Sequence, residues 1–115
     1  MSSVVACKGL RSNSVYSATK AAVRSFARTW ATDLRSRRIR VNAVSPGYTD
    51  TPGLNELLRS SKTGQRRLKM ISNIVPFGRL GSPDEIENAV VFLASDDASY
   101  VTGSELFVDG GFAQV

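Results

Sequence analysis

Helical patterns and short runs of β-branched residues alternate along this chain, and this order restricts the possible fold more than any other feature. From Val15 to about Arg38, apolar residues recur every three or four positions, which is typical of one face of a helix. The apolar positions are Val23, Phe26, Ala27, Trp30 and Leu34. A run rich in β-branched residues follows at 39–44 and stops at Pro46-Gly47, where turn chemistry predicts the end of a strand.

The second half repeats the order of helix and strand. Residues 53–73 are polar and basic with scattered leucines, which predicts one or two short helices. The segment Ser82-Pro83-Asp84-Glu85 predicts a capping box, in which Ser82 caps the next helix and Glu85 reaches back to the cap. The apolar face of that helix would be Ile86, Ala89, Val90, Leu93 and Ala94, and its end would lie at Asp96-Asp97. A last strand is predicted from Glu105 to Val108.

Strands that are connected through helices run parallel, and helices normally cover both faces of such a sheet. The sequence therefore predicts an α/β fold of about three strands with covering helices, counting a possible strand remnant at Ser3 to Ala6. No internal repeat or linker divides residues 1–115. Because two or three strands make a poor free-standing sheet, we expect the C-terminal portion of a larger, doubly wound, Rossmann-like domain.

Residue usage excludes several kinds of site. The chain has no histidine and one cysteine, Cys7, which excludes the usual zinc ligand sets and any Ser/His/Asp triad, so no metal is expected. There is no run of about 20 apolar residues and no basic start followed by an apolar signal core. We therefore expect a cytoplasmic protein that does not enter a membrane.

The formal net charge of +5 raises the question of a nucleic-acid partner. The cations form two clusters, one of Arg35, Arg37, Arg38 and Arg40 and one of Lys62, Arg66, Arg67 and Lys69. The first cluster ends a predicted helix, where cations complement the helix dipole, and neither cluster is interleaved with stacking aromatic residues. A solvated surface is the favoured interpretation, and no nucleic-acid partner is expected.

Tyr16 and Lys20 are the first candidates for chemistry. They are four residues apart at the start of the long predicted helix, so their side chains lie one turn apart on the same side. An ammonium beside a tyrosine hydroxyl favours the phenolate, which makes the pair a plausible general acid or base. On spacing alone, the favoured interpretation is a tyrosine that caps the helix start and a lysine that reaches solvent.

Several segments together resemble the short-chain dehydrogenase/reductase family, in the order that the family has them. They are Tyr16-Ser17-Ala18-Thr19-Lys20-Ala21-Ala22, Arg40-Val41-Asn42-Ala43-Val44-Ser45-Pro46-Gly47-Tyr48-Thr49-Asp50-Thr51, Gly78-Arg79-Leu80-Gly81-Ser82-Pro83-Asp84-Glu85-Ile86, and Val101-Thr102-Gly103-Ser104 with Val108-Asp109-Gly110-Gly111. The resemblance covers nearly all of residues 1–115, which it identifies as part of one such domain. It implies that the catalytic half of the fold is present, whereas no Gly-x-x-x-Gly-x-Gly turn for the cofactor phosphates occurs in the sequence.

The resemblance also implies roles for individual residues. Tyr16 would exchange a proton with the substrate oxygen, and Lys20 would support Tyr16 and hydrogen-bond the nicotinamide ribose. Ser3 lies thirteen residues before Tyr16 and would donate a hydrogen bond to the same substrate oxygen. The loop residues Pro46, Gly47, Tyr48, Thr49 and Thr51 would contact the nicotinamide side of the cofactor, whereas Asn42 would be structural.

The function implied is hydride transfer between NAD or NADP and a small alcohol or carbonyl compound, by a homo-oligomer that is a dimer or a tetramer. Neither the substrate nor the choice between the two cofactors follows from the sequence. The alternative is a truncated, catalytically silent chain that acts at most as an assembly module through its long helices. Reading the coding region upstream of Met1 for a glycine-rich strand and helix would distinguish the two.

Overall fold

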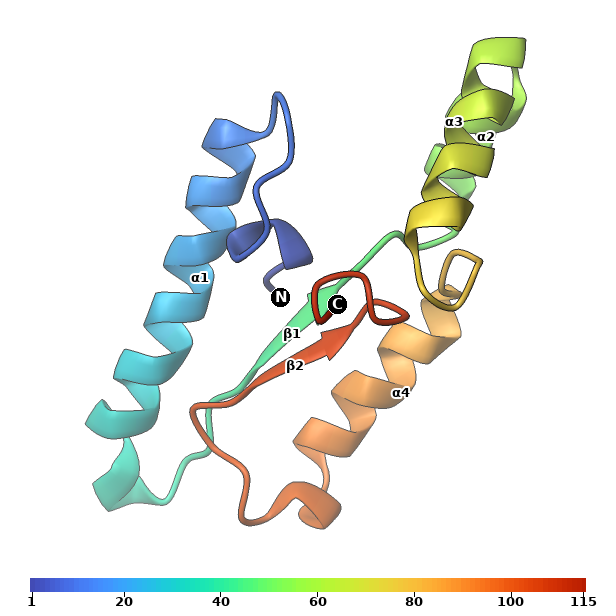
Figure 1. The fold of residues 1–115 in the computed structure, drawn as a ribbon. Coiled ribbons are helices and arrows are strands. Elements are labelled where there is room, and N and C mark those ends of the chain that lie inside the picture. The colour runs from blue at the N-terminus through green and yellow to red at the C-terminus, as the bar shows by residue number, and fades with distance from the viewer.

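Two parallel strands form the centre of the fold, with helices on both sides. The computed structural model describes residues 1–115, except the side chains of Asn55 and Leu57. The elements are η1 (Val4–Ala6), α1 (Ser14–Asp33), η2 (Arg35–Arg37), β1 (Ala43–Pro46), α2 (Pro52–Arg59), α3 (Lys62–Ile74), α4 (Pro83–Ala94), η3 (Asp96–Ala98) and β2 (Glu105–Val108), where η denotes a 3-10 helix. β1 pairs with β2 from Ala43 opposite Glu105 to Pro46 opposite Val108. In Figure 1, α1 and α4 flank the strands, and the α2–α3 hairpin extends away from them. The predicted α/β class with parallel strands is confirmed.

The strand count is two among the described residues, not the three expected. Residues 4–6 were expected to be a strand remnant but form the 3-10 helix η1. The Ser3 hydroxyl accepts a hydrogen bond from the Val5 amide at 3.5 Å, and the Ala6 amide bonds the Ser3 carbonyl at 2.9 Å. These local bonds fold the segment back on itself. The Ser2 amide just before this segment donates to the Val44 carbonyl of β1 at 2.8 Å.

The first strand lies later than expected. The pattern predicted residues 39–44, whereas β1 spans Ala43–Pro46, the stretch that pairs with the four residues of β2. The residues just before β1 bond to the loop before β2 instead of to a strand. The Val41 amide donates to the Thr102 hydroxyl at 3.1 Å. The last strand has the predicted bounds, Glu105–Val108.

The long helix α1 buries a narrower face than the pattern suggested. Ala27 is buried, and Val23 and Leu34 are half-buried. Phe26 and Trp30 are each 51% exposed and stack on one another with ring centroids 5.4 Å apart. The predicted apolar positions therefore divide into an inner face and an exposed aromatic pair.

The apolar residues gather in two small cores instead of one. One joins η1, the α2–α3 hairpin and the C-terminal turn through Val4, Val5, Leu58, Ile71, Val75 and Phe112. The other lies between the strands and α4 and consists of Val44, Ile86, Leu93 and Ala98. Because the α2–α3 hairpin packs on η1, residues from the start, the middle and the end of the chain meet near the carboxyl end of β1.

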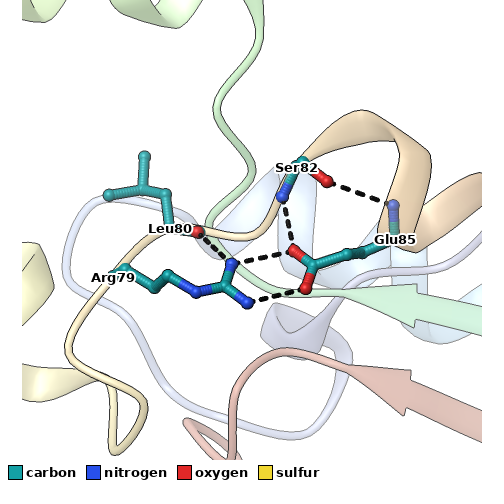
Figure 2. Close-up of polar contacts among 4 residues, drawn as sticks. All are labelled: Arg79, Leu80, Ser82 and Glu85. Carbon is teal, nitrogen blue, oxygen red and sulfur yellow. Dashed lines mark hydrogen bonds and ion pairs between the residues drawn. The ribbon is translucent and has the colours of Figure 1, made fainter.

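The predicted capping box at the start of α4 is confirmed. The Ser82 hydroxyl accepts from the Glu85 amide at 3.3 Å, and the Glu85 carboxylate accepts from the Ser82 amide at 2.7 Å. Figure 2 shows the Arg79 guanidinium donating to both oxygens of that carboxylate, at 2.7 and 2.9 Å. The Arg79 contact is the largest cause that lowers the pKa of Glu85 to about 2. Among the described residues, no helix combines the length and the apolar character that a membrane span needs.

Candidate active site

A cavity of about 210 Å³ lies where β1 ends, between η1, the start of α1 and α3. Its lining residues are Ser3, Val4, Val5, Leu10, Asn13, Tyr16, Gly47, Tyr48 and Arg67. Ligands of open α/β sheets bind outside the carboxyl ends of the strands, and this cavity occupies such a position. Four residues predicted for the site, Ser3, Tyr16, Gly47 and Tyr48, line this single cavity.

Tyr16 and Lys20 lie one turn apart near the start of α1. The Lys20 ammonium is 5.4 Å from the centre of the Tyr16 ring, and it donates a hydrogen bond to the Met1 carbonyl at 3.3 Å. Tyr16 is 49% exposed, so its phenol is accessible from the cavity side without being enclosed. Lys20 does not line the cavity within the described part of the chain. Its ammonium has three donor hydrogens, of which the Met1 contact uses one.

Ser3 reaches the cavity because its neighbour Ser2 anchors the start of the chain. Ser2 is buried, and its hydroxyl donates to the Lys20 carbonyl on α1 at 2.9 Å. Its amide donates to the Val44 carbonyl on β1. Ser2 therefore joins α1 to β1 directly beside the three candidates Ser3, Tyr16 and Lys20, a role that the sequence pattern did not reveal.

Gly47 allows the loop after β1 to pass close to the turn after β2. A Cβ atom at Gly47 would lie 2.8 Å from the Cα atom of Asp109, which a real side chain could not do without a backbone shift. The Asp109 carboxylate accepts hydrogen bonds from the amides of Gly111 and Ala113, each at 2.8 Å, and so fixes this turn. The close approach accounts for glycine at this predicted site position.

The remaining predicted loop residues are Pro46, Thr49 and Thr51, and in this structure they stabilise the local backbone. Pro46 is the last residue of β1, and the Thr49 hydroxyl donates to the Gly47 carbonyl at 3.3 Å. The Thr51 hydroxyl caps α2 by accepting from the Leu54 amide at 3.4 Å. These three residues do not line the cavity in the part of the chain that the structure describes. The structure therefore brings together one half of the predicted site residues and leaves the others beside it.

A buried polar network ties α1 to both strands. Ser45 on β1 is fully buried, and its hydroxyl donates to Glu105 on β2 at 2.6 Å. The other carboxylate oxygen of Glu105 pairs with the Arg24 guanidinium of α1 at 3.1 Å. Because Arg24 lies one turn beyond Lys20, this pair sets the position of the helix that carries Tyr16 and Lys20.

Five lining residues were not predicted for the site, namely Val4, Val5, Leu10, Asn13 and Arg67. Leu10 and Asn13 belong to the segment between η1 and α1, and their approach depends on how η1 folds. Arg67 was assigned to a solvated basic cluster, and no local pattern separates it from its neighbour Arg66. Their placement follows from tertiary packing, which cannot be predicted from the spacing of residues along the sequence.

Comparison with known proteins decides the family. A family model described as enoyl-(acyl carrier protein) reductase matches residues 1–113. The chain belongs to the short-chain dehydrogenase/reductase family. It is 40% identical to the 3-oxoacyl-[acyl-carrier-protein] reductase FabG of Thermotoga maritima, over 96% of this chain and 43% of that protein. It is 41% identical to the dehydrogenase/reductase SDR family member 6 of Rattus norvegicus, over 98% of this chain and 46% of that protein.

Solved structures agree with the family assignment. The crystal structure of Cj0485 dehydrogenase superimposes with a TM-score of 0.94 at 31% identity, covering 99% of this chain and 44% of that one. This chain therefore spans less than half the length of these relatives. The expected family and the Rossmann-like origin of the sheet are both confirmed.

Proposed function

We propose that this chain forms the catalytic part of an oxidoreductase that transfers a hydride between NAD or NADP and an alcohol or carbonyl substrate. The observation that carries the proposal is that two hydroxyl side chains, Ser3 and Tyr16, line one cavity at the carboxyl end of β1. The relative named 3-oxoacyl-[acyl-carrier-protein] reductase supports a carbonyl as the reacting group.

Each of the three polar residues has a separate task in this proposal. Tyr16 gives its hydroxyl proton to the substrate oxygen during reduction and takes it back during oxidation. Ser3 donates a hydrogen bond to the same oxygen and stabilises the charge that develops on it. Lys20 stabilises the negative charge that develops on Tyr16 as its proton leaves, with its ammonium 5.4 Å from the centre of the Tyr16 ring.

The donors around the cavity fit a nicotinamide cofactor, which supplies or accepts the hydride when it is bound. The backbone amides of Tyr48 and Thr49 donate no hydrogen bond to any described residue, so they are available to a carboxamide oxygen. Lys20 has donor hydrogens left for the ribose hydroxyls. Pro46, Gly47 and Thr51 hold the loop that presents these amides.

Tyr16→Phe tests this proposal in the polypeptide encoded by the complete reading frame. General acid or base catalysis contributes about a hundredfold to ten-thousandfold, so we expect kcat to fall by at least about a hundredfold. Cofactor affinity, measured by calorimetry with NADH and NADPH, should stay near that of the unmodified protein because the phenyl ring is kept.

Tyr100→Phe is the matched control because Tyr100 is fully exposed. It should change neither turnover nor cofactor affinity. Normal turnover in the Tyr16→Phe protein would refute the proton-transfer role. A cofactor affinity that fell in step with kcat would show that Tyr16 acts in binding instead.

We also propose that the enzyme is a homo-oligomer. The support is the stacked pair of Phe26 and Trp30 on the outer face of α1, since exposed aromatic residues at one place favour contact with another surface. Light scattering on the complete protein tests the oligomeric state, and a monomer would refute it.

A further inference from the structure

One basic side chain faces the reacting groups. The helix α3 carries four cations, Lys62, Arg66, Arg67 and Lys69, and no aspartate or glutamate. Of these four, Arg67 lines the cavity that holds Ser3 and Tyr16. The proposed function has no task for this cation.

Arg67 has no partner of its own in the described part of the chain. It forms neither an ion pair nor a side-chain hydrogen bond there, unlike Arg24, Arg59 and Arg79, each of which pairs with a carboxylate. The lining of the cavity contains no acidic residue. An anion that enters the cavity therefore meets an unneutralised guanidinium, and the other α3 cations add to the attraction.

The other walls of the cavity set the shape of the ligand. Val4, Val5 and Leu10 contribute apolar side chains to the lining. A volume of about 210 Å³ lies below the roughly 300–1,000 Å³ of drug-sized pockets, so it suits a small molecule. The guanidinium offers a planar pair of donors that matches a carboxylate in two parallel hydrogen bonds.

We propose that the substrate is a small aliphatic or alicyclic acid, with its alcohol or carbonyl at Tyr16 and Ser3 and its carboxylate at Arg67. This inference rests on the proposed function, because Tyr16 and Ser3 define the reacting end. Arg67 selects the substrate and takes no part in the proton or hydride transfer. Arg67 therefore affects only how well the charged end of the substrate binds.

The test compares matched acids and amides on the complete protein. The probes are 4-oxopentanoate with 4-oxopentanamide and 4-oxocyclohexanecarboxylate with its carboxamide, each with NADH and with NADPH. We expect kcat/KM to be at least about tenfold higher for the acids. Arg67→Ala should lower kcat/KM for the acids by about tenfold to a hundredfold, mainly through KM, and leave the amides unchanged.

Arg66→Ala is the matched control, because Arg66 has the same charge on the same helix and does not line the cavity among the described residues. It should change kcat/KM by no more than about twofold, since it contributes only a screened surface charge. Arg67→Lys should restore part of the preference for acids. Arg67 is exposed, so thermal unfolding of Arg67→Ala should match that of the unmodified protein.

The outcomes separate this inference from the proposed function. Equal rates for acids and amides, or an equal loss for both in Arg67→Ala, would overturn the carboxylate site while leaving the oxidoreductase intact. An effect of Arg66→Ala as large as that of Arg67→Ala would overturn the specific carboxylate site. It would show that the acids are attracted by the positive charge of α3 as a whole. Reduction of neither acids nor amides would overturn this inference, whereas the proposed function, which extends to other alcohols and carbonyl compounds, is tested by Tyr16→Phe.

Discussion

At the scale of single residues, Lys20 connects two parts of the site. Its backbone carbonyl accepts the hydroxyl of buried Ser2, while its ammonium lies near the Tyr16 ring and bonds the Met1 carbonyl. The backbone contact fixes the residue, and the side chain keeps donors for a ligand. Removing the side chain therefore affects chemistry and binding more than folding.

Lys20→Ala in the complete protein should lower both kcat and cofactor affinity. A hydrogen bond from a charged donor contributes about 1.5–3 kcal/mol, which corresponds to about a tenfold to hundredfold loss of NADH or NADPH affinity. The loss of kcat follows because no positive charge then lies beside Tyr16 to stabilise the charge that develops there as its proton moves. Calorimetry and steady-state kinetics measure the two effects.

Arg28→Ala serves as the control for Lys20→Ala, because it removes an exposed cation from the same helix without touching the cavity. It should leave both quantities unchanged. A Lys20→Ala protein that binds the cofactor normally would contradict the double role of the lysine.

The sequence could predict part of the lining of this cavity. Ser3, Tyr16, Gly47 and Tyr48 were predicted for the site and line one cavity. Ser2 was missed because its importance lies in two bonds to distant backbone groups, which leave no trace in residue spacing. Arg67 was missed because a basic surface helix gives the same pattern whether or not one of its cations lines a cavity.

At the scale of elements, the start of α4 shows why some boundaries are predictable. The capping box involves two residues three positions apart, Ser82 and Glu85, and each of its hydrogen bonds is local. The sequence alone is therefore enough to predict it. The prediction of a strand remnant at residues 3–6 was wrong for the opposite reason. A strand forms only if a partner pairs with it, and the local bonds of Ser3 closed a 3-10 turn instead.

Glu85→Gln should alter the acid stability of the complete protein. The Arg79 guanidinium and the Ser82 amide hold the pKa of Glu85 at about 2, below the ordinary 4.5. A lowered pKa means that the carboxylate contributes stability above about pH 4.5 and loses that contribution as the pH falls toward 2. We expect the unmodified protein to exceed Glu85→Gln in unfolding free energy at neutral pH, with the difference shrinking below pH 4.5. The effect should be small because the pair is exposed to solvent.

Urea unfolding of both proteins between pH 2.5 and 7 measures the difference. The control is Glu87→Gln, an exposed carboxylate on the same helix that makes no ion pair with any described residue. That variant should show no such pH dependence. A difference between Glu85→Gln and the unmodified protein that stays constant over the range would contradict the role of the ionised carboxylate.

At the scale of the whole molecule, the two small cores leave much apolar surface uncovered. Large side chains on several elements are exposed, including Phe26, Trp30, Phe77, Val91 and Phe92. The two strands β1 and β2 make a sheet that has no third strand at either edge among the described residues. Such surfaces associate with other surfaces in water, and parallel strands are normally covered on both faces.

The polypeptide of residues 1–115 expressed alone should therefore self-associate, and it should neither bind NADH or NADPH at micromolar concentration nor turn over a substrate. Backbone donors at a helix N-terminus after a glycine-rich turn supply most of the grip on a pyrophosphate, and these residues contain no Gly-x-x-x-Gly-x-Gly. Light scattering gives the oligomeric state and calorimetry the cofactor affinity, with the product of the complete reading frame as the control. Self-association with no cofactor binding in both polypeptides would favour the assembly module over the enzyme. A monodisperse monomer of residues 1–115 that binds NADH with micromolar affinity would instead require a phosphate site within these 115 residues, because no other part of the fold would then be present to provide it.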